Sequence, residues 1–126
     1  MRRMIATLLI VLSAVFGLAA CSGPVAPSRD TITVTASTVV IDVRAPAEYG
    51  AGHLEGAINI DAQSADFDSL VTALPTDGVY VVYCSTGNRS GSAVSRMTEL
   101  GFTTLADAGG MDEASASTGL GVVGVP

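Results

Sequence analysis

One short stretch, YCSTGNRSG over residues 83–91, combines a thiol, an arginine and two glycines in a pattern suited to nucleophilic chemistry. It follows the β-prone run VYVV, residues 79–82, and it precedes a segment with helical spacing of apolar residues. Cys84 is therefore predicted to stand between a strand and the start of a helix. The unpaired N–H groups and the dipole at a helix start lower the pKa of a thiol placed there. Cys84 is the candidate catalytic nucleophile.

The residues after Cys84 have the properties of a loop that binds a sulfur anion. Gly87 lets the backbone turn its N–H groups inward as an anion nest, and Ser90 is placed to cap the following helix. Arg89 adds a full positive charge that either faces the anion or pairs with acidic neighbours. The candidate binding loop consists of Ser85, Thr86, Gly87, Asn88, Arg89 and Ser90.

Strand-like and helix-like segments alternate downstream of residue 30, which predicts an α/β fold with a parallel sheet covered by helices on both faces. The predicted strands cover residues 31–34, 38–43, 56–60, 79–82 and 103–105. The predicted helices begin at Pro46, cover residues 61–74 and 90–100, and follow Gly110. Ligands of such sheets bind beyond the carboxyl ends of the strands, which is where Cys84 lies.

Three stretches resemble the rhodanese family of sulfurtransferases. IDVRAPAEYGAGHLEGAINI, residues 41–60, is similar to a long family segment that runs from an Asp-x-Arg motif to a Gly-His motif. CSTGNRS is similar to the family's Cys-x-x-Gly-x-Arg-Ser active-site loop, and LGFTTLADAGGM, residues 100–111, to its last strand and Gly-Gly turn. The resemblance implies a rhodanese-like α/β fold with a five-stranded parallel sheet flanked by helices on both faces.

The resemblance also implies sulfur transfer through a persulfide on Cys84. The thiolate would take the outer sulfur of a donor (thiosulfate, a polysulfide or a persulfide) and pass it to a thiol or to cyanide. Backbone N–H groups from Ser85 to Ser90 would hold the persulfide. Asp42 and Arg44 match a family pair that supports this loop structurally, and Arg44 is also spaced to pair with Glu48. No metal site and no cofactor are implied.

The length of the loop separates sulfur transfer from phosphate chemistry. The Cys-x4-Arg spacing from Cys84 to Arg89 is one residue shorter than in phosphatases that share the fold. The smaller ring of N–H groups suits a single sulfur atom, so no phosphatase activity is expected. Ser85, Thr86 and Asn88 are neutral, whereas thiosulfate-preferring members often have more basic loops. This favours a polysulfide or a protein persulfide as the donor.

Two other functions are compatible with these residues. A non-enzymatic rhodanese-like binding module would use the loop to hold a partner, although such domains typically lack the cysteine. A persulfide carrier or redox sensor would store sulfur on Cys84 or form a mixed disulfide there. Elsewhere, His53 is expected to be structural rather than a base. Ala114 replaces an aromatic residue common in the family, which predicts a weakly anchored last helix.

Residues 1–20 have the pattern of a bacterial lipoprotein signal peptide. Two arginines precede an apolar run from Ile5 to Ala20, and the Leu-Ala-Ala-Cys ending at Cys21 resembles a lipobox. That resemblance implies cleavage before Cys21 and a lipid on its thiol. Residues 21–30 are predicted to be a flexible tether and residues 31–126 the rhodanese-like domain. An uncleaved anchor is the alternative, but the run is short of the ~20 residues that span a bilayer.

Charge and cysteine content restrict the partners of the mature chain. The formal net charge is −6 and lysine is absent, which disfavours nucleic acid as a partner. With Cys21 lipidated, Cys84 is the only free thiol, in a compartment where thiols oxidise. The expected location is the extracytoplasmic face of the cell membrane or the periplasm. The expected partners are a sulfur donor, a thiol acceptor and, through the lipid, the membrane; a monomer is expected.

The lipobox interpretation is tested by Cys21→Ser. Because the modified atom is the Cys21 sulfur, this variant is expected to yield no mature lipidated form. Metabolic labelling with a fatty-acid analogue measures this directly, with the unaltered chain as the positive control. Incorporation of label by Cys21→Ser would contradict the interpretation.

Overall fold

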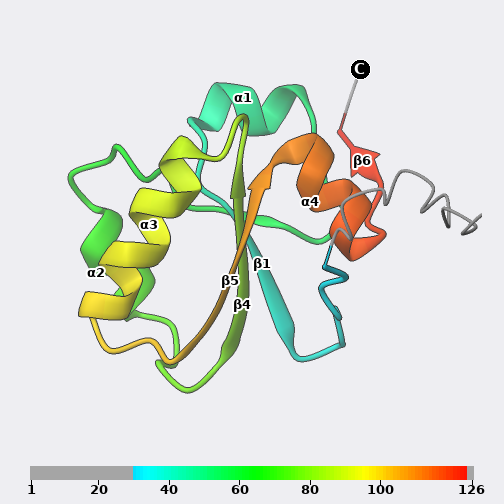
Figure 1. Ribbon diagram of the computed structural model, residues 1–126. Helices are drawn as coiled ribbons and strands as arrows, with labels where there is room; N and C mark the ends of the chain where they lie inside the picture. Colours follow the sequence, from blue (N-terminus) through cyan, green and yellow to red (C-terminus); the bar gives the residue numbers. More distant parts are fainter. Residues whose placement is uncertain (1–29, 125–126) are drawn as a thin grey trace, which may run out of the picture.

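Four parallel strands form the central sheet, in the order β3-β1-β4-β5 (Figure 1). The computed structural model describes residues 30–124. The strands are β1 (Thr38–Asp42), β3 (Ile58–Asn59), β4 (Val79–Cys84) and β5 (Thr104–Gly110). β1 and β4 are central in the sheet, and both strands are buried over their carboxyl-terminal halves. The α/β class and the parallel sheet predicted from the sequence are confirmed.

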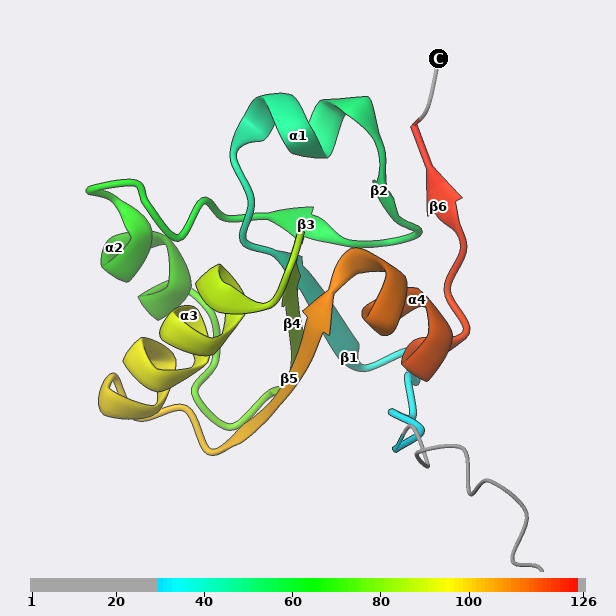
Figure 2. The same cartoon turned by 45° about the horizontal axis from the view of Figure 1, so that its top comes forward.

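Helices cover both faces of the sheet, because alternate residues of each strand point to opposite sides. On one face, α2 (Phe67–Thr72) and α3 (Asn88–Glu99) pack Val71 and Met97 against Ile41 and Val82. On the other face, α4 (Met111–Thr118) packs Ala114 against the side that carries Val40, Val81 and Tyr83. The helix α1 (Pro46–Ala51) lies above the carboxyl ends of the strands (Figures 1 and 2).

The sheet has four strands rather than the expected five. The predicted first strand, residues 31–34, has no strand partner in the structure. Its Ile32 N–H donates instead to the Ser117 carbonyl at 2.9 Å, and Ile32 and Val34 pack into the core cluster beneath α4. The apolar alternation of this segment therefore reflects packing beside a helix, which produces the same period of two as a half-buried strand.

The chain after α4 adds a second, small sheet. The strand β6 (Val122–Val123) pairs antiparallel with β2 (His53–Leu54). Ala114 is fully buried in α4, and the Ser115 hydroxyl donates to the Leu120 carbonyl at 2.7 Å just past the helix. The expectation of a weakly anchored last helix is wrong, since a small residue at position 114 lets the helix sit close to the sheet.

Two sequence-based boundaries also differ from the structure. The helix expected over residues 61–74 is limited to Phe67–Thr72, with Leu70 48% exposed rather than on the buried face. Within residues 30–124, no helix is long and apolar enough to cross a membrane. The predicted signal peptide, Cys21 and most of the tether lie outside the described residues, as do the last two residues of the predicted domain.

Candidate active site

Cys84 is the last residue of β4, and the loop that follows it is short. The helix α3 begins at Asn88, two residues earlier than predicted, and its N-cap is Gly87. Gly87 has φ +103°, a left-handed conformation that favours glycine. Ser90 is therefore not the cap; it lies in the first turn of α3, where its N–H has no partner within the helix. Asn88, Arg89 and Ser90 belong to the helix start and not to a separate loop.

The sulfur of Cys84 lies within this turn and is fully buried. The Gly87 N–H donates to Cys84 Sγ at an N···S distance of 2.9 Å. Burial opposes ionisation of the thiol, but hydrogen bonds from Ser90, Gly87 and Thr86 outweigh it and lower the pKa of Cys84.

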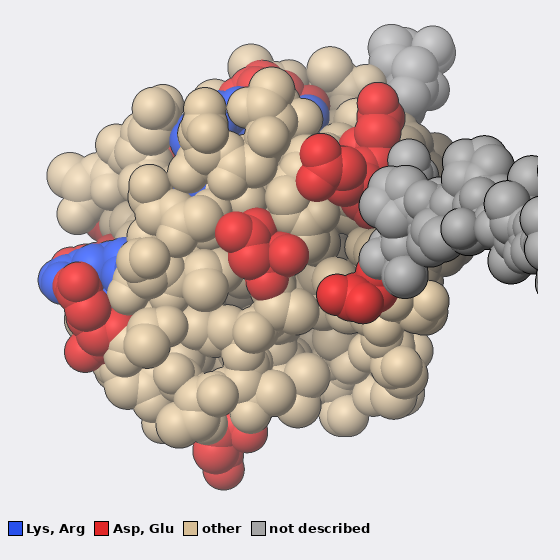
Figure 3. All heavy atoms as spheres, viewed as in Figure 1, with Lys and Arg blue, Asp and Glu red and all other residues tan. Residues whose placement is uncertain are grey.

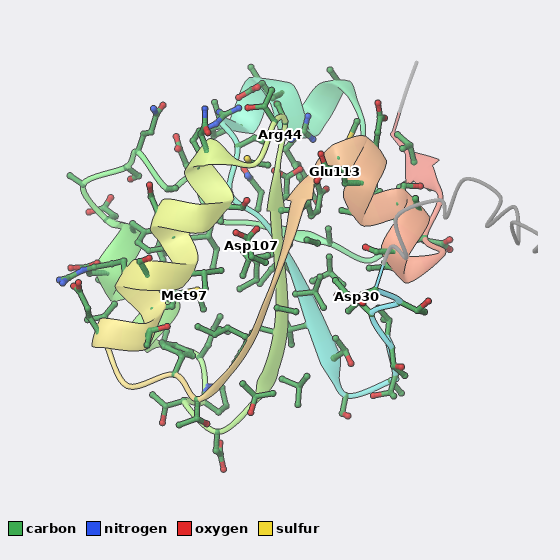
Figure 4. All side chains as sticks on the ribbon, viewed as in Figure 1. Asp30, Arg44, Met97, Asp107 and Glu113 are labelled. Atoms are coloured by element: carbon green, nitrogen blue, oxygen red, sulfur yellow. The ribbon has the colours of Figure 1, made fainter. Side chains whose placement is uncertain are left out.

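Ser90 also ties the turn to the neighbouring strand. Its side chain is fully buried, and its hydroxyl donates at 2.8 Å to Oδ1 of Asp107, which Figure 4 labels on β5. Asp107 Oδ1 also accepts from the Gly109 N–H at 3.0 Å. Because a hydroxyl has one hydrogen, this bond leaves the backbone N–H groups as the main donors to the sulfur.

The end of β5 passes very close to the loop. A Cβ at Gly110 would lie 2.7 Å from the Ser85 carbonyl oxygen, so only glycine permits this approach. Thr86 forms an isolated bridge with Gly110, and the pairing of β4 with β5 shifts register between Val82 and Tyr83. The Gly-Gly pair noted in the sequence thus holds the loop against β5.

Asp42 and Arg44 form a buried ion pair, and Arg44 lies below α1 (Figure 4). Arg44 Nη2 lies 2.6 Å from Asp42 Oδ2 and also donates to the Gly52 carbonyl, at the end of α1. Asp42 accepts the Tyr83 hydroxyl at 2.8 Å, and Tyr83 in turn accepts the Leu54 N–H. The pair therefore connects β1, β4 and α1, and its partner on β4, Tyr83, directly precedes Cys84.

Arg89 is paired with Glu48 of α1. Its Nη1 lies 2.6 Å from Glu48 Oε2, and its Nη2 lies 3.0 Å from Glu48 Oε1 and 3.1 Å from Ser85 Oγ. Glu48 also accepts from the Ser85 hydroxyl and from the Ala45 N–H. Arg89, helped by the Ala45 N–H, lowers the pKa of Glu48 to about 2, so this carboxylate stays ionised at neutral pH.

Of the two alternatives for Arg89, the structure therefore shows pairing with an acid rather than a free guanidinium. The predicted Arg44–Glu48 pair is wrong, because Arg44 turns inward to Asp42 while Glu48 faces the loop. Sequence reasoning placed Glu48 beside Arg44 and therefore missed it as a residue of the active-site turn. Its contact with Arg89 joins α1 to α3, and no local spacing in the sequence indicates it.

Among the described residues, neither His53 nor the acidic side chains beside β5 and α4 form a hydrogen bond with the Cys84 sulfur. The His53 ring stacks on Tyr49 at 3.8 Å, and its Nδ1 is 2.9 Å from the Tyr49 carbonyl oxygen. A hollow of about 700 Å³ lies beside β5 and α4, and its lining includes the carboxylates of Asp30, Asp107 and Glu113 (Figure 4). Across residues 30–124, no three potential ligands gather as they would around a metal ion.

Comparisons with known proteins agree with this geometry. The family model described as Rhodanese-like domain matches residues 30–117. The chain is 37% identical over 84 residues to the thiosulfate sulfurtransferase PspE of Escherichia coli, covering 66% of this chain and 80% of that protein. It is 33% identical over 82 residues to the thiosulfate sulfurtransferase GlpE of Pseudomonas entomophila, covering 64% and 72%. The solved structure of a rhodanese with anions from E. coli superposes with a TM-score of 0.58, at 32% identity, over 68% of this chain and 96% of that one.

The lowered pKa of Cys84 predicts that its alkylation sets in at a lower pH than that of an ordinary thiol. The alkylation rate follows the thiolate fraction, so it rises as the pH passes through the pKa of Cys84. The pH at the midpoint of this rise should be lower in the folded protein than in the protein unfolded by urea. The measurement is the rate of reaction with iodoacetamide as a function of pH, for the folded and for the urea-unfolded protein. It uses a Cys21→Ser chain, in which Cys84 is the only thiol. A folded-state midpoint at or above the unfolded one would show that burial prevails over the hydrogen bonds.

Removing the charge of Asp42 should strongly destabilise the fold. Asp42→Asn leaves the Arg44 guanidinium buried without its counter-charge, which costs about 3–5 kcal/mol of unfolding free energy. Urea denaturation measures this, with exposed Asp77→Asn as the control, expected to stay within about 0.5 kcal/mol of the unaltered chain. Equal stability of the two variants would argue against a supporting function for the pair.

Proposed function

Because this chain belongs to the rhodanese-like family, we propose that it is a sulfurtransferase that carries sulfane sulfur on Cys84. The observation that carries the proposal is the Gly87 N–H donating to the Cys84 sulfur, in a turn whose other N–H groups also lower the pKa of the thiol. A thiolate held by fixed donors is both a nucleophile and a good leaving group for the return step. The sulfurtransferase relatives support the same reaction.

The reaction consists of two sulfur transfers. The Cys84 thiolate attacks the outer sulfur of the donor, a new S–S bond forms, and the donor's own bond to that sulfur breaks. With thiosulfate, the electron pair of the broken bond leaves with sulfite. A thiolate acceptor or cyanide then attacks the outer sulfur of the persulfide, and Cys84 departs as the thiolate.

The N–H groups of the turn stabilise negative charge in both steps. Thr86, Gly87 and Ser90 supply these donors, and the start of α3 adds the positive end of a helix dipole. Because the donors belong to a turn held by Asp107 and Gly110, they need no reorganisation as charge moves between Cys84 and the outer sulfur. The Cys-x4-Arg turn is one residue shorter than the loop of the related phosphatases, which favours a single added sulfur over a tetrahedral phosphate.

We further propose that the protein acts outside the cytoplasm, attached to the membrane by a lipid on Cys21. The proposal is supported by the lipobox-like ending and by the apolar run before it. A lipid on Cys21 would leave Cys84 as the only thiol able to carry sulfur. The donor there is a polysulfide or a persulfide in preference to thiosulfate, and the acceptor is a thiol.

Cys84→Ser tests the sulfurtransferase function. The variant cannot form a persulfide, so thiocyanate production from cyanide should be lost with thiosulfate and with polysulfide alike. Cys21→Ser is the matched control, because it removes the other thiol and should leave the rate unchanged.

A rate for the unaltered chain no higher than that of Cys84→Ser, with every donor, would refute the function. Mass spectrometry of protein isolated from membranes adds a direct measurement. A peptide of Cys84 that is heavier by one sulfur atom supports transfer, whereas a stable disulfide with a partner protein supports the sensor hypothesis.

A further inference from the structure

The charge around the candidate active site is unusual for a protein that handles anions. Residues 30–124 contain twelve carboxylates and three guanidinium groups. Each of these three arginines is paired: Arg44 with Asp42, Arg89 with Glu48, and Arg96 with Asp68 and Glu99. In Figure 3, basic atoms appear at the top and at the left of the molecule, in both places beside acidic atoms.

Arg89 is the one basic side chain of the active-site turn, and its charge reaches the thiol. Glu48 is the main cause that raises the pKa of Arg89, and the negative charge of Cys84 adds to it. The guanidinium would therefore attract an incoming anion if it stood alone. Glu48 holds it by two hydrogen bonds, and the Arg89 side chain is 24% exposed and that of Glu48 38%.

We propose that Glu48 is a specificity-determining residue that acts through Arg89. By neutralising the only guanidinium of the turn, it makes the approach to Cys84 selective for donors of low negative charge and unfavourable to dianions such as thiosulfate. This inference rests on the proposed sulfurtransferase function and names its donor class. That class comprises sulfane-sulfur donors that are neutral or singly charged near the transferred sulfur, such as an organic persulfide.

The position of Glu48 shows how the fold enforces this selectivity. Glu48 lies in the first turn of α1, where its Oε2 also accepts from the Ala45 N–H. The helix α1 is held in place by Arg44, which donates to the Gly52 carbonyl. The carboxylate is therefore fixed over the turn by the helix, and its charge does not depend on pH near neutrality because its pKa is about 2.

Glu48→Gln tests the inference, because it keeps the shape of the side chain and removes the charge. The first readout is the ratio of Cys84 alkylation rates with iodoacetate, an anion, and iodoacetamide, its neutral counterpart. All variants are made in the full chain with Cys21→Ser. The ratio should rise roughly threefold in Glu48→Gln at low salt, and the rise should vanish at an ionic strength of about 1 M. Exposed Glu55→Gln, the matched control, should not change it.

The second readout is turnover with two donors that offer the same kind of outer sulfur. In Glu48→Gln, KM should fall roughly tenfold for the thiosulfate dianion and roughly threefold for the benzenethiosulfonate monoanion, with kcat unchanged for both. Glu48→Asp keeps the charge and should retain the selectivity of the unaltered chain even if its geometry is disturbed.

An unchanged alkylation ratio in Glu48→Gln would overturn the inference. Equal KM changes for the two donors would also overturn it. So would the same change of alkylation ratio in Glu48→Asp as in Glu48→Gln, since either result indicates a structural effect rather than an effect of charge. The alkylation readout needs no turnover. A changed ratio in a chain that transfers no sulfur would therefore support the charge control by Glu48 while refuting the proposed function.

Discussion

The buried carboxylate of Asp42 is the interaction on which the arrangement of the site depends. It accepts from Arg44, from the Tyr83 hydroxyl and from a backbone N–H, so its charge is fully compensated inside the core. Through these partners it joins β1 to β4 and, by way of Arg44, to the end of α1. A buried ion pair with this many partners adds little net stability but allows few alternative geometries. It therefore sets where α1 and the end of β4 meet.

Two opposed electrostatic effects act at that meeting point. The first turn of α3 directs N–H groups at Cys84 and stabilises negative charge on the sulfur. The Glu48 carboxylate, brought by α1, cancels the charge of Arg89 beside the same turn. Stabilisation of the thiolate thus comes from short-range backbone dipoles, which act on an atom already in the turn. Long-range attraction of free anions is weak, because no unpaired cation is present among the described residues of the site.

The sequence predicted the site well where a residue type is required by the backbone. Cys84 at a strand end and Gly87 in a left-handed conformation follow from local rules, and so does the short loop between β4 and α3. Prediction from the sequence failed where two kinds of packing produce the same spacing of apolar residues. The segment around Ile32 alternates like a strand but packs beside α4, and Leu70 has helical spacing but faces solvent. The spacing of apolar residues shows where they recur along the chain, but it does not show which element packs against them.

The sequence by itself determined the groups available for chemistry in this protein: a single thiol downstream of Cys21, a short Cys-x4-Arg turn, and an acidic chain without lysine. Only the tertiary structure decided how the charges pair. Arg89 bonds to Glu48, 41 positions earlier, while Arg44 turns to Asp42 instead of its helical neighbour. Charge pairing depends on which side chains the packed elements bring within a few ångströms. Spacing along the chain predicts such contacts only inside one helix or strand, whereas Glu48 belongs to α1 and Arg89 to α3.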